Sequence, residues 1–118
     1  MKKIYYLSTC STCAEIMKDA NISEQTGFEL QDIRTQPMTS AQVDEMKKLA
    51  GSYEALFSRR ALKYKELALK DKVLTEKDYK SYILEHDTFL KRPVVIWGDK
   101  IFIGSEKKNV TALKEALK

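Results

Sequence analysis

Two cysteines separated by two residues, Cys10 and Cys13, lie between a predicted strand and a predicted helix. Residues 3–8 form a short apolar run, which is typical of a buried strand. Residues 11–20 carry apolar side chains at helical spacing, and residues 27–33 alternate apolar with polar side chains, as a second strand does. A strand, a helix and a strand in this order predict two parallel strands joined by a crossover helix, which restricts the chain to an α/β fold.

The middle of the chain is predicted to be helical. Thr39 and Gln42, three residues on, have the spacing of a capping box, which predicts a helix over about 40–50. Gly51 ends this helix. Residues 52–70 contain two segments with a weaker helical pattern. Thr75 is the expected N-cap of a following helix with a stronger pattern. The face that this last helix is expected to bury carries four side chains at helical spacing: Tyr79, Tyr82, Ile83 and His86.

The last part of the chain predicts a hairpin followed by a helix. Val94 to Trp97 form a continuous apolar strand, Gly98-Asp99 marks a tight turn, and residues 101–103 form the returning strand. A helix over about 106–117 follows. The complete order predicts one mixed sheet with helices on both faces, in a single domain that covers residues 1–118.

Composition supports a compact globular protein. The chain has 118 residues, of which 43% are hydrophobic, and it is long enough to fold without metal or disulfide staples. No apolar run approaches the roughly 18 residues of a membrane helix, and the apolar stretch from Ile4 to Leu7 is too short for a secretory signal. We therefore expect a cytoplasmic monomer that does not bind a membrane.

The net charge of +4 is unevenly distributed. Residues 1–60 hold eight basic and eight acidic residues, so the whole excess lies in residues 61–118, where it is interspersed with carboxylates. This pattern is typical of a solvated surface, and it also fits a face for an anion or an acidic partner. A nucleic-acid-binding arm normally has a tighter basic cluster, so we expect no direct contact with nucleic acid.

The position of the two cysteines favours redox chemistry. A cysteine at a helix N-terminus faces unpaired backbone N–H groups and the positive end of the helix dipole, and both stabilise thiolate. Cys10 should precede the first turn and be the more exposed and acidic thiol, whereas Cys13 should be shielded and within disulfide reach. Two other interpretations remain: half of a zinc site, for which only His86 offers a further ligand, and two small core residues. We expect no metal and no organic cofactor.

Two arginine-containing segments are further candidates. Arg92 precedes Pro93 at the start of the predicted third strand, a position that suits a residue without an N–H donor. Pro93 either simply starts the strand or forms a cis bond beside the cysteines, with Arg92 supplying charge to a thiolate or a bound oxyanion. Arg59 and Arg60 precede a helical stretch, and neighbours on a helix cannot both face one site.

The whole chain resembles the ArsC/Spx/YffB family of thioredoxin-fold proteins. Three segments carry the resemblance: YLSTCSTC, SRRALKYKEL and ILEHDTFLKRPVVI. It implies a thioredoxin-like α/β fold, in which helices flank a four-stranded mixed sheet and a helical insert separates strands two and three.

The resemblance also implies roles for individual residues. Cys10 matches the catalytic or redox-sensing cysteine, and Cys13 matches the second cysteine of the Spx-type motif. Arg92 and Arg60 match residues that stabilise an anion or a thiolate, and Pro93 matches the cis-proline. His86 matches a histidine usually followed by proline, here Asp87, and we interpret His86 as a structural residue on the helix face.

The chain departs from the family where arsenate is bound. Arsenate reductases usually carry one Arg four residues after the catalytic cysteine and another just after the hairpin. Those positions hold Ala14 and the uncharged pair Ile103-Gly104 here. Arsenate needs charge-assisted hydrogen bonds, so we expect arsenate reduction to be weak or absent.

Two functions fit these observations. The first is an ArsC-family thiol–disulfide oxidoreductase, in which Cys10 attacks the substrate and Cys13 resolves the adduct. A small thiol or a thioredoxin- or glutaredoxin-like protein would then restore the dithiol. The second is a Spx-like regulator, in which the same pair is a redox switch that changes affinity for RNA polymerase.

Overall fold

The computed structural model describes residues 1–118, and the chain divides into two compact units. The first comprises Met1–Gln36 and Arg92–Lys118 and contains every strand of the sheet. The second comprises Pro37–Lys91 and is helical. No helix in either unit combines the length and the apolar character that crossing a membrane requires.

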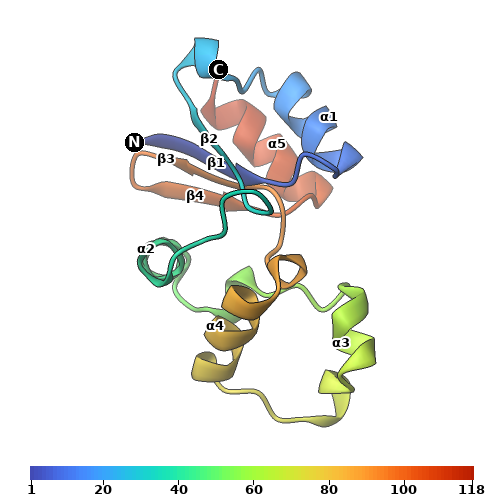
Figure 1. Ribbon diagram of the computed structural model, residues 1–118. Helices are drawn as coiled ribbons and strands as arrows, with labels where there is room; N and C mark the ends of the chain where they lie inside the picture. The colour runs from blue at the N-terminus through green and yellow to red at the C-terminus, as the bar shows by residue number, and fades with distance from the viewer. The chain divides into compact units, whose positions relative to one another are not determined.

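The first unit is built on a four-stranded mixed sheet of order β2-β1-β3-β4 (Figure 1). Its strands are β1 (Lys2–Tyr6), β2 (Glu29–Asp32), β3 (Val94–Trp97) and β4 (Lys100–Ile103). β1 pairs with β2 in parallel and with β3 antiparallel, and β3 and β4 form the hairpin. The predicted four-stranded mixed sheet, with its parallel first pair and its antiparallel hairpin, is confirmed.

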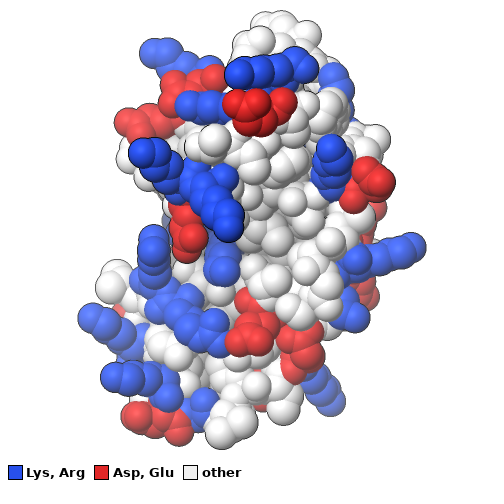
Figure 2. Space-filling view, turned by 180° about the vertical axis from the view of Figure 1, so that it is seen from behind, with Lys and Arg blue, Asp and Glu red and all other residues white.

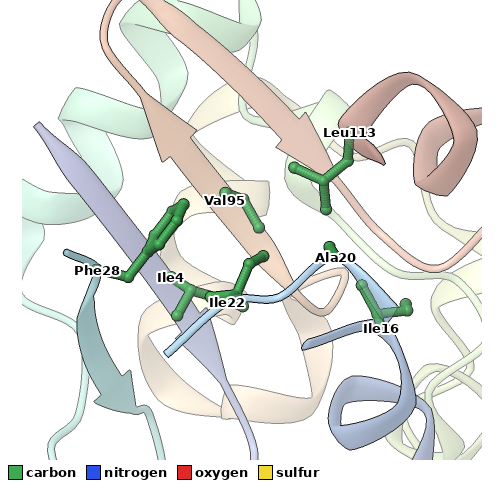
Figure 3. Packing of buried hydrophobic residues seen from close by; sticks show 7 residues of the cluster. All are labelled: Ile4, Ile16, Ala20, Ile22, Phe28, Val95 and Leu113. Carbon is green, nitrogen blue, oxygen red and sulfur yellow. The ribbon is translucent and has the colours of Figure 1, made fainter. Parts of the chain in front are cut away.

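Two helices of the first unit cover the same face of this sheet: α1 (Ser11–Asp19) and α5 (Lys107–Ala116). Ile4 and Val95 are opposite each other on β1 and β3, and their side chains belong to one buried cluster. Ile16 and Leu113 enter that cluster from α1 and α5 (Figure 3). Burial of these apolar side chains is the main force that fixes both helices on the sheet.

The start of β2 depends on how α1 ends. Asn21 takes a left-handed backbone conformation with φ of 57°, which asparagine adopts more readily than most residues. The Ile22 N–H then donates to the Met17 carbonyl at 2.8 Å. This closure turns the chain back, and both Ile22 and Phe28 are buried in the same core.

The second unit holds α2 (Ser40–Ala50), α3 (Leu62–Glu66) and α4 (Glu76–Glu85). Thr39 caps α2: its hydroxyl accepts from the Gln42 N–H, and the Gln42 side chain accepts from the Thr39 N–H, each at 3.1 Å. Thr75 and Asp78 form the same reciprocal pair at the start of α4. Both predicted caps are therefore present.

The weaker helical predictions are only partly confirmed. Residues 52–70 form the five-residue α3 and single 3₁₀ turns at Glu54–Leu56 and Leu69–Asp71. The prediction that His86 lies on the face of α4 is wrong, because α4 ends at Glu85 and His86 has an extended backbone. The chain leaves the helix there to form the 3₁₀ turn Asp87–Phe89, which buries Phe89 and sets its ring edge-on to His86.

Candidate thiol site at the start of the first helix

Cys10 is the N-cap residue of α1. Its backbone is extended, and its sulfur accepts a hydrogen bond from the Cys13 N–H at 3.4 Å. The Cys10 N–H donates to the Leu7 carbonyl at 3.0 Å, and the Ala14 N–H donates to the Cys10 carbonyl at 3.2 Å. Oxygen-bearing side chains usually fill this position, so here a sulfur receives the N–H donors of a helix start.

This environment makes the Cys10 thiol more acidic. Partial burial acts to raise the pKa of Cys10, but the Cys13 N–H, the Cys13 thiol and the positive charge of Arg92 outweigh it. The Thr12 N–H adds to the same effect, and the resulting pKa lies below the ordinary value. The fraction present as thiolate, the nucleophilic form, is therefore raised at neutral pH.

Cys13 has the opposite properties. Its side chain is fully buried, and burial raises the pKa of Cys13 to about 11. A hydrogen bond with the Leu7 backbone and the charge of Arg92 act to lower this pKa, whereas the neighbouring Cys10 raises it further. Both cysteines are free thiols in the structure. The site therefore combines a half-buried acidic thiol with a buried thiol that stays protonated at neutral pH.

Arg92 and Pro93 lie in the same unit as the two cysteines. The bond between them is cis, as predicted, and the buried Pro93 leads directly into β3. The charge of Arg92 lowers the pKa of both thiols. Arg92 is thus placed to stabilise a thiolate at Cys10 electrostatically.

The loop between β4 and α5 is held by Asn109, a residue that the sequence did not single out. The Asn109 side chain accepts from the Ile103 N–H at 3.2 Å and donates to the Gly104 carbonyl at 2.8 Å. Gly104 is buried with φ of 89°, and its N–H donates to the Pro93 carbonyl at 2.9 Å. The Gly104–Pro93 hydrogen bond therefore joins this loop to the cis-proline, and residues 103 and 104 carry no charged side chain.

Asp32 is a second residue that the sequence did not single out. A hydrogen bond from the Ser8 hydroxyl is the largest cause that lowers the pKa of Asp32, and the Arg34 N–H adds a bond of 3.1 Å. Ser8 lies two residues before Cys10, so this hydrogen bond fixes the turn that leads to Cys10. The sequence does offer one indication of this contact. Asp32 and Ser8 lie at the carboxyl ends of two adjacent parallel strands, and such ends meet at one edge of a sheet.

Arg60 lies in the second unit, at an exposed position just before α3. The structure therefore brings together Cys10, Cys13, Arg92 and Pro93 within one unit, and the role of Arg60 stays a prediction. No group of three or more His, Cys, Asp or Glu side chains is arranged to hold a metal ion.

A mixed sheet of order β2-β1-β3-β4, with paired cysteines at the start of α1 and a cis-proline at the start of β3, defines a thioredoxin-like fold. The family model of ArsC matches residues 5–113. The chain belongs to the ArsC family.

Solved structures agree with this assignment. An arsenate reductase from Vibrio cholerae is 20% identical with a TM-score of 0.76, and the match covers 95% of this chain and 96% of that one. A YffB protein is 14% identical with a TM-score of 0.78, and all of both chains is covered. A protein from Staphylococcus aureus, solved by NMR in solution, is 26% identical with a TM-score of 0.71, covering 95% and 97% of the two chains. No curated protein sequence matches the chain.

Proposed function

We propose that the protein is an ArsC-type thiol–disulfide oxidoreductase in which Cys10 is the nucleophile and Cys13 the resolving thiol. One observation carries the proposal: the two thiols are adjacent, and their pKa values are displaced in opposite directions. We also propose the cytoplasm as its compartment, because thiols are kept reduced there.

The reaction proceeds in two exchange steps. The Cys10 thiolate attacks one sulfur of a substrate disulfide, the substrate S–S bond breaks, and the first substrate thiolate leaves. The Cys13 sulfur then attacks the Cys10 sulfur of the mixed disulfide, and its proton neutralises the second departing thiolate. The substrate gains two electrons and the protein becomes a Cys10–Cys13 disulfide. A small thiol or a thioredoxin- or glutaredoxin-like protein reduces that disulfide again.

Arsenate is a poor fit for the same nucleophile. Ala14 is exposed and uncharged, and residues 103 and 104 carry no cation where family enzymes usually hold arginines. Each missing charge-assisted hydrogen bond weakens an oxyanion site by about 1.5–3 kcal/mol, so the loss of two weakens it by about 10²-fold or more. Disulfide exchange needs no such clamp, since it is governed by thiol pKa and access.

Turnover of a small disulfide tests the proposal. Reduction of hydroxyethyl disulfide by glutathione would be followed, and the rate measured without the protein would be subtracted, because glutathione reduces this disulfide slowly by itself. Cys10→Ser should abolish turnover and Cys13→Ser should trap a mixed disulfide on Cys10, whereas Ser11→Ala, between the two, should keep the rate. Unchanged turnover in Cys10→Ser would refute the assignment. With arsenate, a specificity constant of about 10⁴ M⁻¹s⁻¹ or higher would restore arsenate as the substrate.

A second candidate is a Spx-like regulator that binds RNA polymerase. The presence of both cysteines favours it, and so does the match of Arg60 through the family resemblance. In this case oxidation of Cys10 and Cys13 changes affinity for polymerase, and no substrate is turned over. Co-purification of reduced and oxidised protein with RNA polymerase separates the two candidates, since an oxidoreductase without regulatory function would show no redox-dependent difference.

A further inference from the structure

One short segment carries a charge excess equal to the net charge of the whole chain. Residues 59–73 hold six basic and two acidic residues, whereas the other 103 residues hold fifteen of each sign. We call residues 59–73 the basic segment. It lies wholly within the second unit and contains α3. Figure 2 shows Lys and Arg side chains gathered over the part of this unit that carries α3.

The basic segment also exposes apolar side chains. Leu62 is 77% exposed, Val73 is 96% exposed and Leu67 is 38% exposed, so three of the five large exposed hydrophobic residues of the chain lie here. Within the segment, Leu69 is the buried apolar anchor. These apolar side chains alternate with the basic ones along the segment, a composition that suits an interaction surface.

The charges of the segment are only partly neutralised by the fold. Lys63 pairs with Glu66 at 3.2 Å, and Arg59 pairs with Glu54 at 2.8 Å. Lys65, Lys70 and Lys72 are exposed and form no ion pair. These three ammonium groups are therefore available to a partner.

We propose that the basic segment docks an acidic protein segment that carries apolar side chains. The lysines attract its carboxylates and determine the association rate and its dependence on salt. Leu62 and Val73 bury their side chains against its apolar residues, which supplies most of the affinity.

Three other occupants fit less well. Duplex nucleic acid is held through phosphates by cations and gains little from Leu62 or Val73. A membrane surface takes a longer amphipathic helix than the five residues of α3. A second copy of the chain would bring two positively charged segments together, which is repulsive.

The test uses a short fluorescent peptide in which Asp and Glu alternate with Leu, and a matched peptide with Ser in place of Leu. Binding to the full chain is measured by fluorescence anisotropy at low and high salt. NMR chemical shifts of the wild-type protein map the contact without any substitution. We expect the largest shifts within residues 59–73, tighter binding of the Leu peptide, and weaker binding as salt rises.

Three double variants, one of them a control, separate charge from apolar contact. Lys65→Glu with Lys70→Glu should weaken binding of the Leu peptide about tenfold. Lys100→Glu with Lys108→Glu makes the same change in net charge on the first unit and should change affinity by less than about twofold. Leu62→Ser with Val73→Ser should weaken binding at least about tenfold while the net charge stays constant. Since all six positions are exposed, urea unfolding should show that these variants fold like the wild type.

Several results would overturn the proposal. One is equal binding of the Leu and Ser peptides, or unchanged affinity after Leu62→Ser with Val73→Ser, because the segment would then be a general polyanion surface. Another is tighter binding of a duplex DNA or of phosphatidylglycerol vesicles, which would assign the segment to nucleic acid or to a membrane. Chemical shifts that concentrate outside residues 59–73 would place the contact elsewhere.

Discussion

Alkylation should distinguish the two cysteines of the motif sharply. Burial raises the pKa of Cys13 to about 11 from an ordinary value of 9.0, whereas the pKa of Cys10 is lowered. A rise of about two pKa units makes the thiolate fraction about a hundredfold smaller at neutral pH. Iodoacetamide at pH 8 should therefore label Cys10 first, and label Cys13 at least about a hundredfold more slowly than an ordinary cysteine.

Peptide mass spectrometry of quenched samples gives the two rates separately, and protein unfolded in urea is the control. In urea the two rates should converge, because the fold that separates the pKa values is absent. Equal rates in the folded protein, or faster labelling of Cys13, would refute the electrostatic argument.

The raised pKa of Cys13 also affects the stability of the fold. Its contribution to the free energy of unfolding is fully present below about pH 9 and is lost as pH rises through about 11. Cys13→Ala should lack this part of the pH dependence of the free energy of unfolding.

Three further substitutions test the thiol site and the stability of each unit. Arg92→Ala should raise the pKa of Cys10, since the Arg92 charge lowers it. The midpoint of the alkylation rate of Cys10 plotted against pH should then move to higher pH. Arg92→Lys keeps the positive charge and should keep most of the effect. Leu113→Ala should lower the free energy of unfolding by about 2–5 kcal/mol in urea titrations, because Leu113 is fully buried between α5 and the sheet. Thr75→Ala should cost about 1 kcal/mol through loss of the α4 cap, with the exposed helix-interior change Thr111→Ala as a control expected to have no destabilising effect.

The strands and the capped helices could be predicted from the sequence because their signals are local. Thr39 and Thr75 each form a capping box with a side chain three residues on, which predicts where the helix begins. The apolar run from Val94 to Trp97 predicts the bounds of β3. The position of Cys10 at a helix start follows from the same local pattern. That position in turn carried the correct expectation of a more acidic Cys10 and a shielded Cys13.

Other features depend on contacts between distant segments and could not be predicted. The Ser8–Asp32 hydrogen bond requires the register that places Tyr6 opposite Asp32. Asn109 holds a loop whose conformation the sequence leaves open. His86 continues the helical spacing of α4, but the burial of Phe89 in the following turn ends the helix one residue earlier.

The central claim is that Cys10 and Cys13 act as one redox pair, and oxidation of the reduced protein by one equivalent of oxidised glutathione tests it most directly. Mass spectrometry should show the loss of two hydrogen atoms and a peptide linked through Cys10 and Cys13. Cys13→Ser should instead keep a glutathione adduct on Cys10. A stable glutathione adduct on wild-type Cys10, with Cys13 still a free thiol, would contradict the account.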